Sequence, residues 1–250
     1  MPENKRVLAA MPHPDDMEIL CAGTLIRLSA LGFAVHVAVM TAGDKGSDEL
    51  PRAEIAAIRR TEAQKGAALI GAASCRCLEF ADLEIVFDNT ARRTLAGLVR
   101  EIDPLIVMTT PPFDYMMDHI VTSTLVRDAC FNAGCRNYPA EGTPTTGAPY
   151  LYYTDAVGGT DLFGQETPVS STFDVTAQMG QKAAALECHD SQRTWLRRQH
   201  GLDDYVGSMR SWAAKRGGQI GVAYAESWIQ HRGHPHPSDD ILAALLASET

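Results

Sequence analysis

The sequence from position 6 to 28, RVLAAMPHPDDMEILCAGTLIRL, combines three structural signals. Its opening, Arg6–Met11, is a short apolar run that predicts a buried strand. A loop of proline, histidine and aspartate follows this strand. Apolar residues at helical spacing then predict a helix over 17–31, with Gly32 as its stop. Together these signals predict the first half of a strand–helix–strand unit.

The same alternation continues along the chain. Further buried strands are predicted at 33–40, 75–80 and 105–109, and helices at 52–70, 90–102 and 119–133. Strands that alternate with helices favour right-handed crossovers and a parallel sheet covered on both faces. In the last third, a strand is predicted at 150–156 and helices at 175–188 and 202–216. We therefore expect an α/β, Rossmann-like, mostly parallel sheet with helices on both faces, as one domain over 1–250.

The composition excludes several classes of protein. The 22 basic and 31 acidic side chains leave a net charge of −9, which disfavours nucleic acid as a partner. No apolar stretch approaches the ~20 residues of a membrane span, and the N-terminus has no apolar signal segment. We expect a cytoplasmic protein whose six cysteines stay reduced, namely Cys21, Cys75, Cys77, Cys130, Cys135 and Cys188.

Two groups of metal-binding residue types follow predicted strands. His13-Pro14-Asp15-Asp16 comes after the first strand, and residues 114–119 (DYMMDH) come after the strand at 105–109. Because carboxyl ends of parallel strands meet at one edge of a sheet, these groups are expected to lie together. His13, Asp16 and His119 could hold a metal ion and leave one position for water, while Asp15 takes its proton. Alternatively, Asp15 or Asp16 only caps the helix that follows.

The opening stretch resembles the start of the PIG-L/LmbE-like deacetylases, a strand followed by (A/P)HPDD-x-E-x-x-x-x-GT. Further similarities follow in the family's order, in Thr41-Ala42-Gly43-Asp44, IRRTEA at 58–63, residues 182–192 and Tyr224-Ala225-Glu226. The resemblance implies a Rossmann-like fold that holds one divalent metal ion, normally zinc. It also implies removal of acyl groups, usually acetyl, from amino sugars or their conjugates.

Carried over by position, the resemblance implies zinc on His13, Asp16 and His119, with Asp15 as the general base. Other divalent ions also suit two histidines and a carboxylate. The expected substrate is a small N-acyl amino sugar or conjugate, and a homo-oligomer is expected because relatives often assemble. We interpret His189 and Glu226 as structural, because buried polar groups need partners.

Two further residues receive roles from the resemblance. Arg59 corresponds to an arginine that reaches the substrate; alternatively, it forms a salt bridge with Glu62 or Asp44 on a helix surface. Asp118 corresponds to a family aspartate that orients a catalytic histidine; alternatively or in addition, it caps the helix predicted to start at His119.

The chain departs from the family at one point. The family's H-P-D-H reads Met116-Met117-Asp118-His119 here, and methionine can neither stabilise an oxyanion nor protonate the leaving amine. Losing such a contact costs about 10²–10³ in rate. One hypothesis is that His234 or His236, from the same or a neighbouring subunit, supplies the acid; the alternative is a solvated tail.

The loop at 114–119 also offers candidates for contact with the substrate. Tyr115 and Asp114 are lesser substitutes for the missing histidine, and Tyr115 and Met116 are expected to contact the substrate. Met116, with Met117, could form an apolar wall that selects a less polar acyl group or aglycone.

Other functions remain open at this stage. An amidase acting on a larger conjugate would use the same metal site, with its pocket shaped by residues 138–149 and 158–168. A non-catalytic Rossmann-like binding protein is disfavoured, because the first strand–helix turn lacks G-x-G-x-x-G and carries two aspartates. A metal-binding protein without turnover is the third alternative, given Met116.

Overall fold

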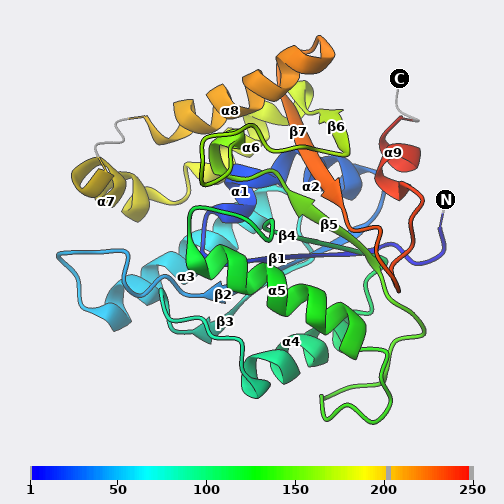
Figure 1. Cartoon of the computed structure of the whole chain (residues 1–250). Helices are drawn as coiled ribbons and strands as arrows, with labels where there is room; N and C mark the ends of the chain where they lie inside the picture. The colour runs from blue at the N-terminus through cyan, green and yellow to red at the C-terminus, as the bar shows by residue number, and fades with distance from the viewer. Residues whose placement is uncertain (1, 201–203, 248–250) are drawn as a thin grey trace.

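The computed structural model describes residues 2–200 and 204–247, and its sheet has seven strands. The spatial order of the strands is β3-β2-β1-β4-β5-β7-β6, in which the first five named are parallel and β7 is antiparallel to both its neighbours (Figure 1). The strands are β1 (Arg6–Met11), β2 (Ala34–Thr41), β3 (Ser74–Phe80), β4 (Ile106–Thr109), β5 (Tyr150–Thr154), β6 (Ser171–Asp174) and β7 (Ala225–Gln230).

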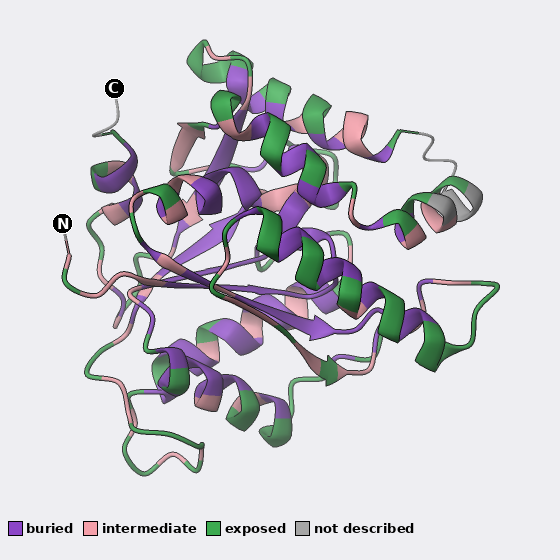
Figure 2. Ribbon diagram, turned by 180° about the vertical axis from the view of Figure 1, so that it is seen from behind, coloured by how far each residue is buried: buried purple, intermediate pink, exposed green. Residues whose placement is uncertain are grey.

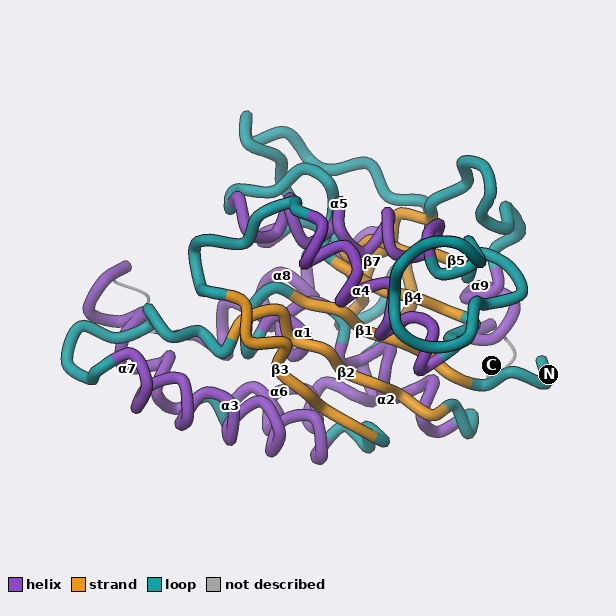
Figure 3. The backbone as a smooth tube through the Cα atoms, turned by 90° about the horizontal axis from the view of Figure 1, so that it is seen from below, coloured by secondary structure: helices purple, strands orange, loops and turns teal. Residues whose placement is uncertain are grey.

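Helices cover both faces of this sheet (Figure 3). The central strands are buried between helices whose outer sides are exposed (Figure 2). One face packs on α4 (Asn89–Ile102) and α5 (Met117–Asn132). The other helices are α1 (Asp16–Leu20), α2 (Ala22–Ala30), α3 (Arg52–Leu69), α6 (Met179–Leu186), α7 (Asp190–His200), α8 (Tyr205–Ile220) and α9 (Ile241–Leu246).

Strand β1 explains why both faces are covered. Val7, Ala9 and Met11 belong to one core cluster, whereas Leu8 and Ala10 belong to the cluster with α4 and α5. Successive side chains of a strand point to opposite faces, so an uninterrupted apolar run requires packing on both. The predicted fold class, a mostly parallel sheet with helices on both faces, is confirmed.

The order of the strands also places the candidate site. From β1 the chain moves outward to β2 and β3, and it then returns to β4 and β5 on the other side of β1. The loops after β1 and β4 therefore diverge, and in open sheets ligands bind in the crevice at such a switch point. Both predicted groups of metal-binding residues follow these two strands.

The helix predicted over 17–31 is two helices with a break at Cys21. The second helix begins where Glu226 of β7 accepts hydrogen bonds from the backbone N–H groups of Gly23 and Thr24, at 2.8 and 2.7 Å. The same carboxylate pairs with Lys182, which is 1% exposed. The structural interpretation of Glu226 is thus confirmed, since a carboxylate at a helix N-terminus satisfies unpaired donors there.

The last third differs most from the sequence prediction. The antiparallel β7 and the edge strand β6 were not predicted, nor were α7 and α9. Residues predicted as one helix over 175–188 form a turn followed by α6, and the helix predicted at 202–216 begins at Tyr205 as α8. All six cysteines are free, as expected. No described helix has both the length and the apolar character needed to span a bilayer.

Removing the buried carboxylate of Glu226 is expected to destabilise the fold. In Glu226→Gln, the buried Lys182 loses its counterion, and breaking a buried pair in this way costs about 3–5 kcal/mol. The free energy of unfolding from urea titration measures this. The matched control is Glu101→Gln, which breaks an exposed pair with Arg76 and should cost about 1 kcal/mol or less. Equal losses in the two variants would contradict the assignment.

Candidate metal centre

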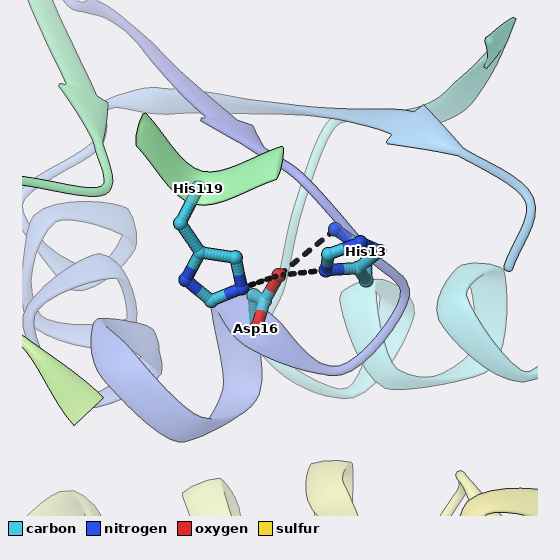
Figure 4. A group of neighbouring side chains, drawn as sticks. All are labelled: His13, Asp16 and His119. Carbon is cyan, nitrogen blue, oxygen red and sulfur yellow. Dashed lines mark hydrogen bonds and ion pairs between the residues drawn. The ribbon is translucent and has the colours of Figure 1, made fainter. Parts of the chain in front are cut away.

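The loop after β1 and the start of α5 bring three side chains together. The Oδ2 atom of Asp16 lies 3.2 Å from Nδ1 of His13 and 3.5 Å from Nε2 of His119. Figure 4 shows the Asp16 carboxylate between the two imidazole rings. Ligand atoms at tetrahedral corners about 2.0–2.1 Å from a zinc ion lie about 3.3 Å apart, so this spacing fits such an ion. The structure brings together the three ligands predicted from sequence.

The other nitrogen of each ring faces carboxylates. Nε2 of His13 lies 3.2 Å from Asp118 and 3.3 Å from Asp82, and Nδ1 of His119 lies 3.3 Å from Asp114. Carboxylates in this position fix the orientation and tautomer of a metal-binding histidine. They favour Nδ1 of His13 and Nε2 of His119 as the atoms that bind a metal. Nε2 of His13, Asp82 and Asp118 form a second, neighbouring group close enough to hold a cation.

The electrostatics of the centre follow from its burial and its charges. Burial alone lowers the pKa of His13, but the adjacent Asp118, Asp16 and Asp82 outweigh it and raise that pKa well above its ordinary value. Burial raises the pKa of Asp16, but His119 and His13 outweigh it and lower the pKa to about 2. Asp16 and Asp114 also raise the pKa of His119 against the effect of burial, so the carboxylates favour the protonated histidines when no metal ion is bound. Metal binding at this site must release protons.

Asp15 lies beside the three ligands but has different contacts. Its backbone is left-handed, with φ 103°, which is uncommon outside glycine and tolerated best by aspartate and asparagine. Its Oδ2 accepts a 2.6 Å hydrogen bond from the Tyr205 hydroxyl and lies 3.5 Å from Nη2 of Arg59. Burial raises the pKa of Asp15, and the positive charge of Arg59 opposes this. Asp15 occupies the N-cap position of α1, but its side chain makes no capping hydrogen bond, and the Asp16 carboxylate accepts from the His13 N–H instead, so the capping alternative is wrong for both side chains.

Arg59 is buried in α3 and 4% exposed. It donates hydrogen bonds to the carbonyl of Pro14 at 2.9 Å and to that of Gly43 at 3.3 Å. The alternative of a surface salt bridge with Glu62 or Asp44 is therefore wrong. Arg59 thus links the backbone of the HPDD loop to that of the loop after β2, and its contact with substrate stays a prediction.

The remaining predicted residues lie at the start of α5 and in the segment just before it. Asp118 accepts a 2.8 Å hydrogen bond from the Leu83 N–H and faces His13, so the histidine that it orients is a candidate metal ligand. Helix α5 begins at Met117 without a side-chain cap, so the capping role is wrong. Tyr115 is exposed, with its ring 5.6 Å from that of His119, and Met116 is half-buried. Neither has a contact that establishes substrate binding.

The C-terminal histidines lie at the end of the sheet where the parallel strands begin, opposite the end that carries the metal centre. His236 bonds to the carbonyl of Pro149 at 2.8 Å, and the His231 N–H donates to Leu151 at 2.9 Å, both where β5 begins. Figure 1 places this segment beside the N-terminus, where β1 starts. Five residues of β5 span about 16 Å from there to the edge with the metal centre. Neither buried His236 nor exposed His234 therefore serves the centre of its own chain; action on a neighbouring subunit stays a prediction.

Sequence reasoning missed two residues of the site. Asp82 follows β3, another parallel strand, so its position at the carboxyl edge of the sheet was a usable signal. Tyr205 reaches Asp15 across 190 positions of sequence, and no local pattern marks it. His189 is fully buried, with Nε2 3.1 Å from Glu18, which agrees with its structural interpretation.

The chain is similar to known proteins over most of its length. The model of the PIG-L family, described as GlcNAc-PI de-N-acetylase, matches residues 8–130. The diacetylchitobiose deacetylase of Thermococcus kodakarensis is 28% identical over 193 residues, which are 75% of this chain and 70% of that protein. Its sequence thus aligns beyond the residues that the family model matches.

Solved structures agree with this similarity. The conserved protein TT1542 from Thermus thermophilus has a TM-score of 0.76 and 27% identity, covering 90% of this chain and 93% of that one. N,N'-diacetylchitobiose deacetylase from Pyrococcus horikoshii has a TM-score of 0.80 and 25% identity, covering 96% and 89%. The order of the strands, the position of the HPDD segment and these similarities agree: residues 8–130 match the PIG-L family, and similar proteins include named deacetylases.

Proposed function

We propose that this protein is a zinc-dependent hydrolase that removes the acetyl group from an N-acetylated amino sugar or its conjugate. The observation that carries the proposal is the convergence of His13 Nδ1, Asp16 Oδ2 and His119 Nε2 beside the buried carboxylate of Asp15. The relatives named as deacetylases of diacetylchitobiose support the substrate class. The acidic composition supports a small-molecule substrate rather than a nucleic acid.

In the proposed reaction, His13, Asp16 and His119 would hold the zinc ion. When bound, zinc supplies Lewis acidity, which lowers the pKa of water to about 7 and polarises a carbonyl group. Asp15 accepts a proton from the attacking water as the oxygen–carbon bond to the amide forms. The carbon–nitrogen bond then breaks, and Asp15 returns the proton to the amine. Acetic acid and a free amine leave, and the acid gives up its remaining proton to solvent.

Asp15 carries both proton transfers because Met116 replaces the family's histidine. Tyr115, from the same loop, contacts the His119 ring, and its pKa is raised above its ordinary value by desolvation of the phenol and by the charges of Asp16 and Asp114. A phenol with a raised pKa is a poor acid at neutral pH. This leaves Asp15 as the group in the site that can both take and return the proton.

The rim of the centre favours a substrate with an apolar substituent, which is the larger-conjugate alternative. Leu83, Tyr115 and Met117 are 58%, 68% and 67% exposed, and each lies next to or contacts a residue of the centre. Leu83 also has a left-handed backbone, with φ 60°. Non-glycine residues in this conformation store strain and cluster at functional sites. Exposed apolar side chains around a polar site are typical of binding surfaces.

The rim gives a prediction about specificity. In Met117→Ser, we expect kcat/KM for an aryl glycoside of N-acetylglucosamine to fall about 10-fold, because contact with one apolar side chain is worth about 1–3 kcal/mol. The value for free N-acetylglucosamine should change less than about 2-fold, because it lacks the aryl group that would contact the rim. The control is Ile220→Ser, which replaces another exposed apolar residue, at the end of α8. Equal effects on both substrates would show that Met117 does not contact the aryl group.

The proposed function is tested by measuring acetate and free amine released from N-acetylglucosamine and its glycosides. Zinc-loaded protein is expected to release both in equal amounts, and treatment with a chelator is expected to abolish release until zinc is restored. Absence of release from every N-acetylated sugar, with the protein folded and loaded, would overturn the proposal.

A further inference from the structure

Tyr205 is the first residue of α8 and links this distant helix to the candidate base. Its hydroxyl oxygen lies 2.6 Å from Oδ2 of Asp15, although 190 positions separate the two residues. The side chain is 6% exposed, and its ring belongs to an apolar cluster between helices. That cluster contains Val175, Met179, Ala183, Leu186, Met209 and Ala213. The ring is thus fixed by packing, which leaves the hydroxyl little freedom to move.

The two carboxylate oxygens of Asp15 differ in their contacts. An ionised carboxylate can only accept hydrogen bonds, so the phenol is the donor to Oδ2. Nη2 of Arg59 approaches the same atom at 3.5 Å. In the part of the chain that the structure describes, the hydrogen bond and the ion pair of this carboxylate both go to Oδ2, and none is formed to Oδ1. One oxygen is therefore anchored, and the other is available to accept a proton.

The backbone of Asp15 gives a reason why an anchor is needed. Its left-handed conformation is strained, and the following residue, Asp16, must face the metal position. The side chain of Asp15 makes no hydrogen bond within its own loop; its partners come from α3 and α8. Without them, rotation about the side-chain bonds would displace Oδ1. Misplacement by about 1 Å can cost about 100-fold in rate.

We propose that Tyr205 is a positioning residue for the reaction: its hydroxyl anchors Oδ2 of Asp15, so that Oδ1 is held for proton transfer. The inference rests on the proposed function. Tyr205 acts through Asp15 and does not touch the reacting atoms. The rival is a structural role, in which the phenol only ties α8 to the loop after β1.

Tyr205→Phe separates these roles, because phenylalanine keeps the ring in its cluster and removes the hydroxyl alone. The matched control is Tyr152→Phe, since Tyr152 is also buried and donates a 2.9 Å hydrogen bond to a carboxylate, Asp240, away from the metal centre. We expect Tyr205→Phe to lower kcat about 10- to 100-fold with KM and zinc content unchanged. Tyr152→Phe should leave kcat unchanged. A kcat for Tyr205→Phe equal to that of Tyr152→Phe overturns the proposal.

A double-mutant cycle with Asp15→Asn tests whether Tyr205 acts through the base. We expect Tyr205→Phe to have no further effect on the residual activity of Asp15→Asn, because residues that act as a unit are not additive. Full additivity would contradict the positioning role. The two failures are distinguishable: if Asp15→Asn is fully active, the base role in the proposed function fails, whereas an impaired Asp15→Asn beside an unaffected Tyr205→Phe refutes only this inference.

Discussion

Asp15→Asn is expected to lower kcat by about 10³-fold while the protein keeps its metal, because asparagine cannot take a proton from water and a placed base contributes about 10²–10⁴ in rate. Asparagine has nearly the same shape, tolerates the left-handed backbone of position 15 and can still accept the hydrogen bond from Tyr205. The measurements are kcat with the best N-acetylated substrate and zinc content by elemental analysis.

The control for this variant is Asp103→Asn. Asp103 also has a left-handed backbone, with φ 47°, but it is exposed at the end of α4 and pairs with Arg6. Its substitution should leave kcat and zinc content unchanged. A fully active Asp15→Asn would show that another group accepts the proton, and the proposed mechanism would be wrong.

His119→Ala is expected to lower zinc affinity by more than about 100-fold and to abolish activity at limiting zinc. Removing a group that only supports a ligand already costs about 10- to 100-fold in affinity, and His119 supplies a ligand atom itself. Asp114→Asn should produce that smaller loss, because Asp114 contacts Nδ1 of His119 at 3.3 Å. Competition with a chromophoric chelator measures both affinities.

A control variant distinguishes the loss of a zinc ligand in His119→Ala and Asp114→Asn from a general loss of structure. His36→Ala, on β2, removes a half-buried histidine that contacts Ser74 and should keep zinc affinity unchanged. If His119→Ala binds zinc as tightly as the parent, the ligand set derived from the geometry is incorrect. If Asp114→Asn is the weaker binder of the two, the order of ligand and support is reversed.

The central half of the fold could be predicted because its signals are local. The apolar runs of β1 and β4 and the helical spacing between them are read within short windows. Ends of parallel strands share one edge, and this alone predicts that His13 and His119 lie together. The same argument, applied to the end of β3, would have found Asp82.

Residues placed by long-range packing could not be predicted in this way. Tyr205 reaches Asp15 only because α8 packs beside α6, and β7 pairs with β5 across a long and irregular segment. For Arg59, the alternative of a helix-surface salt bridge failed because the loop holding Gly43 covers this side chain. His234 has a side chain that could act as an acid. Because β7 runs antiparallel to β5, however, the segment after β7 lies at the end of the sheet opposite the metal centre. In each case the deciding contact involves residues far apart in sequence.

The position of the metal ion tests the central claim most directly. Crystals of the zinc-loaded protein, measured on both sides of the zinc absorption edge, give an anomalous difference map that locates the ion. The account predicts one strong peak within about 2.0–2.2 Å of His13 Nδ1, Asp16 Oδ2 and His119 Nε2. A peak between His13 Nε2, Asp82 and Asp118 instead, or no peak in this part of the molecule, would contradict it.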